Sequence, residues 1–232
     1  GYDDNASAKY FDIPGKVVEY REGIYVGYRY YRSASIKVQY PFGFGLSYTT
    51  FDYSDISVDG NKVSFTLTNS GGVDGAEVSQ LYVSKPDSMI FRAEEELKGF
   101  AKTFLAAGES KRVTITLDDK AFRYFNVVTN KWEVEAGSYE IRIGASSEDI
   151  KLTAITEVEG TEAPNPYDKT EYAKYYEKFR NDPAYAEMGE MQPREDFTEF
   201  LEYGDNCITA EEDRKEIAAR LKRDGKVTFM AW

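Results

Sequence analysis

Carboxylates are the residues of this chain that could most readily do chemistry. The 232-residue sequence has 41 Asp and Glu residues and no histidine. The lack of histidine excludes Ser-His-Asp and Cys-His catalysis and zinc sites built on histidine. Hydrolysis of a glycosidic bond needs only two carboxylates at the right separation. Because no carboxylate has a local setting that distinguishes it, we predict no catalytic residue, no metal ligand and no cofactor.

Other reactive motifs also favour structural roles. Glu94, Glu95 and Glu96 are expected to form a solvated part of a loop, because runs of like charge usually face water. Cys207 is the one cysteine, so it cannot form an intramolecular disulfide, and no histidine can activate it. The Gly-Phe-Gly sequence at residues 43–45 lacks the third glycine and the following helix of a nucleotide-binding loop.

One segment invites a functional interpretation. Residues 84–93 separate two predicted strands, and this loop is longer than a hairpin needs. It contains Met89, Phe91 and Arg92, which are our candidates for contacts at the rim of an active site on a neighbouring domain. The alternative, which the sequence favours, is a loop that packs on the neighbouring domain and has only a structural role.

Short strands are the elements that must position this loop. Alternating apolar and polar residues, with turn signals between them, predict about seven strands over residues 51–155. This pattern is typical of an antiparallel sandwich of the immunoglobulin or fibronectin type III kind. Trp132 lies in an alternating strand, which favours a place in the core over a role as a sugar-binding platform. The predicted core consists of Val63, Phe65, Leu67, Val113, Ile115, Leu117, Trp132, Val134, Tyr139, Ile141 and Ile143.

Residues 1–50 are dense in aromatic rings. Residues 23–31 are rich in aromatic and β-branched types and predict a strand, whereas the glycines of residues 41–48 predict an irregular connection. Fifty residues with one strand cannot bury so many rings. We therefore expect residues 19–50 to pack on the sandwich or to mediate self-association with a second copy of the chain.

Residues 156–232 change to a helical period. A linker is expected between Ile155 and Asp168. An aromatic stripe from Tyr172 to Phe179 predicts a helix near residues 168–180, and a capping box from Thr209 to Glu212 begins a second one over residues 209–224. The fold class is thus mainly β, with a small N-terminal α/β remnant and a helical C-terminal extension.

Charge and hydropathy narrow the possible partners. The net charge of −12 argues against nucleic acid, whose binding depends on cationic contacts to phosphates. No apolar run is long enough for a membrane-spanning helix. The chain begins with Gly1 and has no signal peptide, so we interpret it as an excised piece of a longer protein. The sequence leaves its localisation unknown, with the cytoplasm as one option.

Several motifs in order resemble glycoside hydrolase family 3, the β-glucosidase family. The motifs are EGIYVGYRYY (22–31), PFGFGLSYTTF (41–51), EVSQLYV (77–83), ELKGF (96–100), AGE (107–109), WEVEAGSY (132–139) and GASSEDI (144–150). The resemblance implies that residues 1–50 end an α/β sandwich domain and that residues 51–155 form the fibronectin type III-like domain of such an enzyme. It also implies a retaining parent enzyme whose other domains are partners of this chain.

The chain also departs from the family. The family's nucleophile Asp and acid/base Glu belong to other domains, and their Ser-Asp-Trp and Ser-Gly-Glu-Gly surroundings do not occur here. Ala93 stands where the family often has Pro. Nearly 80 residues follow the fibronectin-like domain, which in members with permuted domain order would lead to the barrel. The resemblance leaves the usual and the permuted domain order both open.

Two functions follow from these patterns. The first is a non-catalytic accessory part of a family 3 β-glucosidase, which lends a loop to the active-site rim. The second is a free-standing carbohydrate-binding or adhesion module of immunoglobulin-like fold. The rings of residues 1–50 favour the first, because an independent module should not carry rings that it cannot bury. Neither interpretation identifies the sugar or the linkage.

Overall fold

The computed structural model describes residues 24–166. The chain divides into two compact units, and one of them, residues 27–168, contains nearly all of the described residues. The predicted helices near 168–180 and 209–224 lie outside the described residues. Within residues 24–166, no helix has the length and hydropathy needed to cross a membrane.

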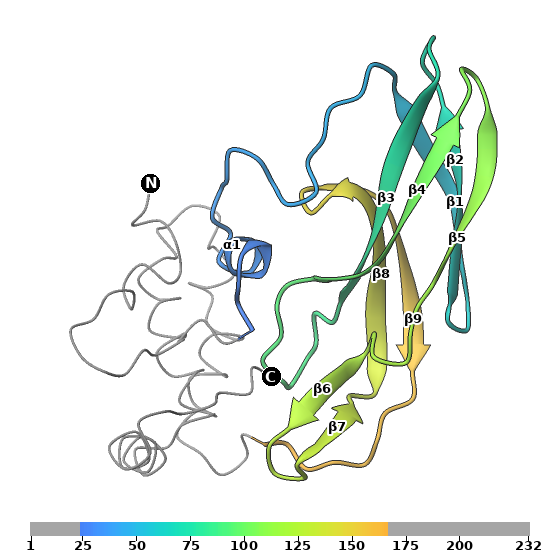
Figure 1. Ribbon diagram of the computed structural model, residues 1–232. Coiled ribbons are helices and arrows are strands. Elements are labelled where there is room, and N and C mark those ends of the chain that lie inside the picture. Colours follow the sequence, from blue (N-terminus) through green and yellow to red (C-terminus); the bar gives the residue numbers. More distant parts are fainter. Residues whose placement is uncertain (1–23, 167–232) are drawn as a thin grey trace, which may run out of the picture. The chain divides into compact units, whose positions relative to one another are not determined.

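Nine strands and one short helix make up the described residues (Figure 1). In chain order they are α1 (Tyr28–Ser33), β1 (Phe51–Asp59), β2 (Lys62–Asn69), β3 (Gly75–Ser84), β4 (Glu96–Leu105), β5 (Ser110–Thr116), β6 (Arg123–Asn126), β7 (Lys131–Val134), β8 (Gly137–Ser146) and β9 (Asp149–Val158). The mainly β fold class is therefore confirmed.

Two antiparallel sheets form a sandwich. One has the strand order β1-β2-β5 and the other the order β4-β3-β8-β9. The predicted number of seven sandwich strands is confirmed, but the members differ. β1 and β4 belong to the sandwich, whereas β6 and β7 form a separate two-stranded sheet at one end of it (Figure 1).

The core lies between the two sheets, as the alternation in the sequence indicates. Of the predicted core residues, nine are buried, Val134 is half-buried and Trp132 is exposed. The nine buried ones are Val63, Phe65, Leu67, Val113, Ile115, Leu117, Tyr139, Ile141 and Ile143. Leu81 and Val83 of β3 and Leu105 of β4 complete the core from the facing sheet.

The prediction that Trp132 is buried was wrong. Its side chain is 56% exposed, while its neighbour Glu133 is 9% exposed. Alternation places the two on opposite faces of β7, but it does not determine which face is covered. The hydroxyl of Thr129 donates a hydrogen bond to the Glu133 carboxylate at 2.9 Å. The polar residue therefore faces inward with a partner, and the indole faces outward.

The predicted strand at residues 23–31 was also wrong, because residues 28–33 form α1. Gly27, at φ 60°, interrupts the extended backbone immediately before the helix. In α1, Tyr28 and Arg32 lie one turn apart on the same face. Both reach the chain at the start of β4, since Tyr28 contacts Leu97 and Arg32 contacts Glu95. Tertiary contacts thus override the strand propensity of the aromatic residues.

The expected linker begins later than residue 155. β9 continues through Val158, and the backbone N–H of Thr161 donates to the carbonyl of Val134 at 2.8 Å. The side-chain amide of Asn126 donates to the carbonyl of Pro164 at 2.8 Å. The chain after β9 therefore packs along the β6–β7 hairpin.

Candidate functional site

The long loop predicted between two strands joins β3 to β4, and the carboxylate of Glu135 fastens it. The hydroxyl of Ser88 and the backbone N–H of Met89 each donate to Glu135 at 2.6 Å. The Nε atom of Arg92 lies 3.5 Å from the same carboxylate. One side chain after β7 therefore fixes the middle of the loop.

The three candidate rim residues differ in placement. The side chain of Met89 is 51% exposed and that of Phe91 is half-buried. Arg92 is only 10% exposed at its side chain, and its Nη2 donates to the carbonyl of Phe122 at 3.3 Å. Its guanidinium lies 5.5 Å from the ring centre of Tyr124 and 5.8 Å from that of Tyr139. Arg92 thus contacts groups of its own domain.

The buried ring of Tyr139 reports on this environment. Burial raises the pKa of the Tyr139 hydroxyl to about 12, although the nearby charge of Arg92 acts in the opposite direction. Its hydroxyl donates to the carbonyl of Glu135 at 2.8 Å. The phenol therefore remains protonated at neutral pH and serves as a structural donor.

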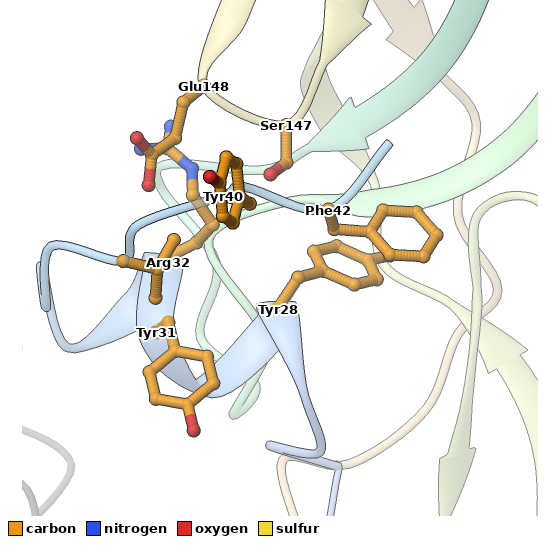
Figure 2. A pocket seen from close by; sticks show the side chains of 8 residues that line it. Tyr28, Tyr31, Arg32, Tyr40, Phe42, Ser147 and Glu148 are labelled. Atoms are coloured by element: carbon orange, nitrogen blue, oxygen red, sulfur yellow. The ribbon is translucent and has the colours of Figure 1, made fainter. Parts of the chain in front are cut away.

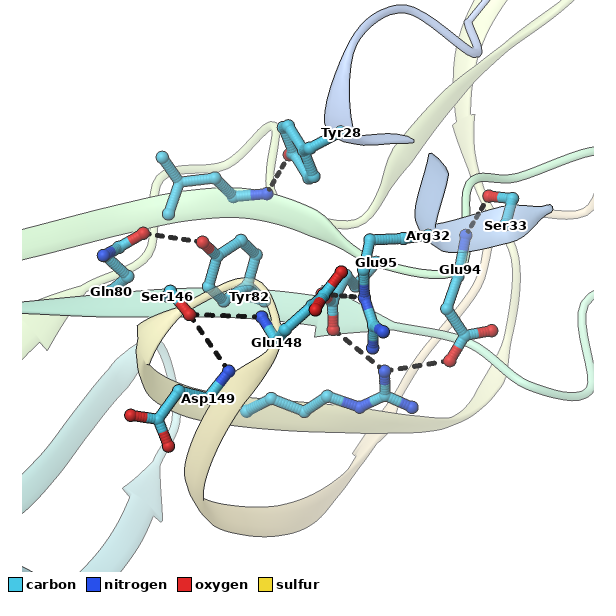
Figure 3. Close-up of polar contacts among 12 residues, drawn as sticks. Tyr28, Arg32, Ser33, Gln80, Tyr82, Glu94, Glu95, Ser146, Glu148 and Asp149 are labelled. Atoms are coloured by element: carbon cyan, nitrogen blue, oxygen red, sulfur yellow. Dashed lines mark hydrogen bonds and ion pairs between the residues drawn. The ribbon is translucent and has the colours of Figure 1, made fainter. Parts of the chain in front are cut away.

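A second cluster of charges lies where the loop enters β4 (Figure 3). Glu95 is completely buried, which corrects the prediction that residues 94–96 are solvated. Its two carboxylate oxygens accept from Nε of Arg32 and from Nη1 of Arg142, each at 3.0 Å. The buried carboxylate thus joins α1 to β8 through two arginines.

Arg142 is the centre of this cluster. Besides Glu95, it contacts Glu94 at 2.9 Å and Glu140 at 2.7 Å. Burial alone would lower the pKa of Arg142, but the hydrogen bonds that it donates to the three carboxylates, led by Glu140, raise it. The guanidinium remains charged and pairs the buried carboxylate of Glu95 with the more exposed carboxylates of Glu94 and Glu140.

α1 and the following chain form a shallow groove on the domain (Figure 2). The ring of Tyr28 stacks on that of Phe42 with centres 4.5 Å apart. The backbone N–H of Ser147 donates to the carbonyl of Phe42 at 2.9 Å. The groove has a volume of about 200 Å³ and is lined by Tyr28, Tyr31, Arg32, Val38, Tyr40, Phe42, Ser147 and Glu148.

Residues 40–48, which we call the aromatic segment, continue from this groove. The amide of Gln80 holds their backbone, because its Nε2 donates to the carbonyl of Gly43 at 3.1 Å and to that of Ala145 at 2.7 Å. Gly43 has φ 81°, and a Cβ there would overlap the Gln80 amide. The backbone at Gly43 is thus held against β3. Glycine suits this position because it has no Cβ and adopts a positive φ without strain.

The apolar side chains of the aromatic segment are largely exposed, although the ring of Phe42 also stacks on Tyr28. Leu46 is 91% exposed and Tyr48 is fully exposed. Tyr40, Phe42 and Phe44 are each more than 40% exposed. A row of exposed apolar side chains on a backbone held by hydrogen bonds is typical of a surface that another domain or protein covers.

Several of the carboxylates that the structure describes are held in ion pairs and hydrogen bonds. Residues 24–166 contain no group of three or more His, Cys, Asp or Glu residues that could hold a metal ion. Among the carboxylates with defined partners there, Glu95 is bound by two arginines, and Glu135 by an arginine, a hydroxyl and a backbone N–H. The arrangement can hold a loop and present a surface.

Comparison with known proteins identifies the sandwich. Residues 77–147 match the family model described as a fibronectin type III-like domain. The sandwich is a fibronectin type III-like domain. The chain is 48% identical to thermostable beta-glucosidase B of Acetivibrio thermocellus over 162 residues. This alignment covers 66% of the chain and 22% of the relative. It is also 42% identical to an exo-alpha-(1->6)-L-arabinopyranosidase of Bifidobacterium longum, over 75% of the chain and 24% of the relative.

Solved structures agree with this assignment. The GH3 beta-glucosidase of Bifidobacterium adolescentis superposes with a TM-score of 0.67 at 38% identity, over 80% of this chain and 28% of that one. The beta-glucosidase of Kluyveromyces marxianus in complex with glucose gives a TM-score of 0.64 at 43% identity, over 68% of this chain and 20% of that one. The chain with its fibronectin type III-like domain matches the C-terminal region of family 3 β-glucosidases. It spans about a quarter of the length of these relatives.

The sequence missed two parts of this site. Glu135 and the Arg32–Glu95–Arg142 cluster join residues that lie far apart in the chain, so no local pattern indicates them. The Glu-Glu-Glu run was visible, but its solvent exposure was misjudged. Arg142 gave no signal either, because it occupies a polar position of the alternating strand at residues 139–143, where a charged side chain is expected to face water.

Proposed function

We propose that this chain is a non-catalytic accessory part of a family 3 glycoside hydrolase, whose parent enzyme is a retaining β-glucosidase. Residues 1–50 would end its α/β domain, residues 51–155 would form the fibronectin type III-like domain, and residues 156–232 would be an extension. Support comes from the family match of the domain and from the small share of the relatives' length that the chain covers.

The exposed aromatic segment is the observation that carries the docking role. Its rings are held outward by a backbone that Gln80 fixes on β3. The remaining domains of the parent enzyme are the partner that would cover them. A free-standing module is disfavoured, because Leu46 and Tyr48 would then expose nearly all of their apolar surface to water.

We further propose that the loop between β3 and β4 lies at the rim of the parent's active site. Met89 would contribute the main contact there, since it is 51% exposed whereas the side chain of Arg92 is 10% exposed, and the half-buried Phe91 would lie beside it. Arg92 would position the loop from within the domain through Glu135 and the two tyrosine rings.

A double substitution in the intact parent enzyme tests docking. The combined substitutions Leu46→Ser and Tyr48→Ser should lower the temperature at which the enzyme loses half of its activity, because the interface loses apolar contact. Activity is measured as hydrolysis of an aryl β-glucoside. Ile155→Ser is a matched control, since Ile155 is 70% exposed on β9, and it should leave that temperature unchanged. The same temperature of half-inactivation for the double variant and the unsubstituted enzyme would contradict docking through the aromatic segment.

The isolated chain tests the remaining parts of the proposal. It should not hydrolyse an aryl β-glucoside, whatever its concentration. Light scattering tests whether a second copy of the chain covers the aromatic segment instead. Self-association through this segment would give a dimer, and the double variant would then be a monomer. Turnover by the isolated chain that a substitution of one of its own carboxylates abolishes would refute the accessory role.

A further inference from the structure

The outward face of the β6–β7 hairpin carries an exposed aromatic ring, that of Trp132, which lies outside the core of the sandwich. Phe125 and Trp132 are directly paired across the two strands, and Arg123 is paired with Val134. Because side chains alternate along a strand, these four residues share one face of the hairpin. Tyr124 and Glu133 occupy the opposite face.

Trp132 is held in a defined orientation. Its ring and that of Phe125 meet edge to face, with centres 5.5 Å apart and planes inclined at 75°. Even so, the indole is 56% exposed. An edge-to-face neighbour supports the ring from one side and leaves much of its apolar face accessible.

A polar pair lies next to this ring on the same face. Arg123 donates from Nη2 to the carboxylate of Asp119 at 2.7 Å. The side chains of Arg123 and Asp119 are 34% and 70% exposed. Arg123 is the diagonal cross-strand neighbour of Trp132, and such neighbours lie roughly 7–8 Å apart. This face thus places the exposed indole of Trp132 near a hydrogen-bond donor, Arg123, and an acceptor, Asp119. The separation is about the width of one sugar ring.

Hydrogen bonds within the domain hold the turn of the hairpin. The side-chain oxygen of Asn126 accepts from the backbone N–H of Val128 at 2.9 Å, and its amide holds the carbonyl of Pro164. Thr129 closes the turn through its bond to Glu133. A ligand on the outward face would therefore not have to order the turn, which lowers the cost of binding.

We propose that this face binds a β-linked glucopyranose chain, with one ring stacked on Trp132 and its hydroxyls bonded to Arg123 and Asp119. A pyranose with equatorial hydroxyls presents C–H groups above and below its ring and polar groups around the edge. This matches an exposed indole beside an Arg–Asp pair. Aromatic residues and Arg are also enriched at protein interfaces, whereas Asp is depleted there, so a protein contact is the competing occupant that light scattering tests below.

The proposed saccharide site shares no residue with the aromatic segment or with the groove. Binding there can therefore coexist with docking of the domain on a parent enzyme. Its value to a glycosidase, which would be to retain a glucan near the enzyme, rests on the proposed function, whereas the binding itself does not.

Titration of the 232-residue chain with cellotetraose, followed by calorimetry, tests the proposal. We expect Trp132→Ala to weaken binding by about tenfold or more, because stacking on the ring is lost. Asp119→Ala should weaken it several-fold, and since this residue is exposed the fold should remain intact. Phe104→Ala is the matched control, because Phe104 is 59% exposed on β4, and its affinity should equal that of the unsubstituted chain.

Three results would overturn the proposal. The first is the absence of heat of binding in the unsubstituted chain. The second is equal affinity of the Trp132→Ala chain, with circular dichroism confirming that it is folded. The third is a change of molar mass on Trp132→Ala in light scattering, which would assign this face to a protein contact. Failure of docking in the parent enzyme would leave all three readouts unaffected, so the two proposals fail separately.

Discussion

Glu95 is the residue whose environment differs most from its sequence context. It is the middle member of an acidic run, yet it is completely buried between Arg32 and Arg142. Glu95→Ala should lower the free energy of unfolding by about 3 kcal/mol, because removing one partner of a buried ion pair leaves charge uncompensated. Urea unfolding of the chain measures the loss. Asp119→Ala, in an exposed pair with Arg123, should change stability little. Equal effects of the two substitutions would mean that burial of Glu95 contributes nothing.

At the scale of elements, the aromatic segment depends on a glycine that fits against β3. Gly43 has φ 81°, and a Cβ there would meet the Gln80 amide, whereas a Cβ at Gly45 would meet nothing within 4 Å. Gly43→Ala should cost about 1–3 kcal/mol, because the substitution both strains the backbone and displaces the amide. Gly45→Ala should be close to neutral. Proteolysis between residues 40 and 50 should accelerate in the first variant alone, and similar rates in both would show that the segment does not depend on this contact.

The whole sandwich is held together mainly by apolar contacts, but several hydrogen bonds also join its two sheets, such as the one from the side-chain amide of Asn69 in β2 to the carbonyl of Leu105 in β4. A second such bond carries a titratable group. The hydroxyl of Tyr53 in β1 donates to the carboxylate of Glu77 in β3 at 2.8 Å. Burial raises the pKa of Glu77 above its ordinary value, although the bond from Tyr53 opposes this. The folded state therefore binds more protons than the unfolded state, so the contribution of Glu77 to stability falls as the pH rises above about 4.5.

Glu77→Gln should remove this dependence while retaining an acceptor for Tyr53. Compared with the unsubstituted chain, the variant should gain relative stability between about pH 4.5 and pH 7. Thermal unfolding at a series of pH values gives the difference between the two curves. A constant difference across that range would show that Glu77 titrates alike in the folded and unfolded chains.

The sequence by itself determined the sandwich and most of its core. Alternation along β2, β5 and β8 identified the strands. A residue that faces the other sheet is removed from water, and this favours an apolar side chain at every second position. The ordered motifs also indicated the family before any contact was known. The long loop between β3 and β4 followed from its length, since a hairpin connection needs fewer residues.

Tertiary structure alone decided which faces are covered and which charges are buried. Trp132 and Glu133 alternate as expected, yet only the packing of the hairpin turns the carboxylate inward. The rings of residues 28–31 favour a strand locally, but contacts with β4 stabilise α1 instead. Glu95 is buried because Arg32 and Arg142, 63 and 47 residues away in the chain, converge on it. Such choices depend on partners distant in sequence, and no local period contains that information.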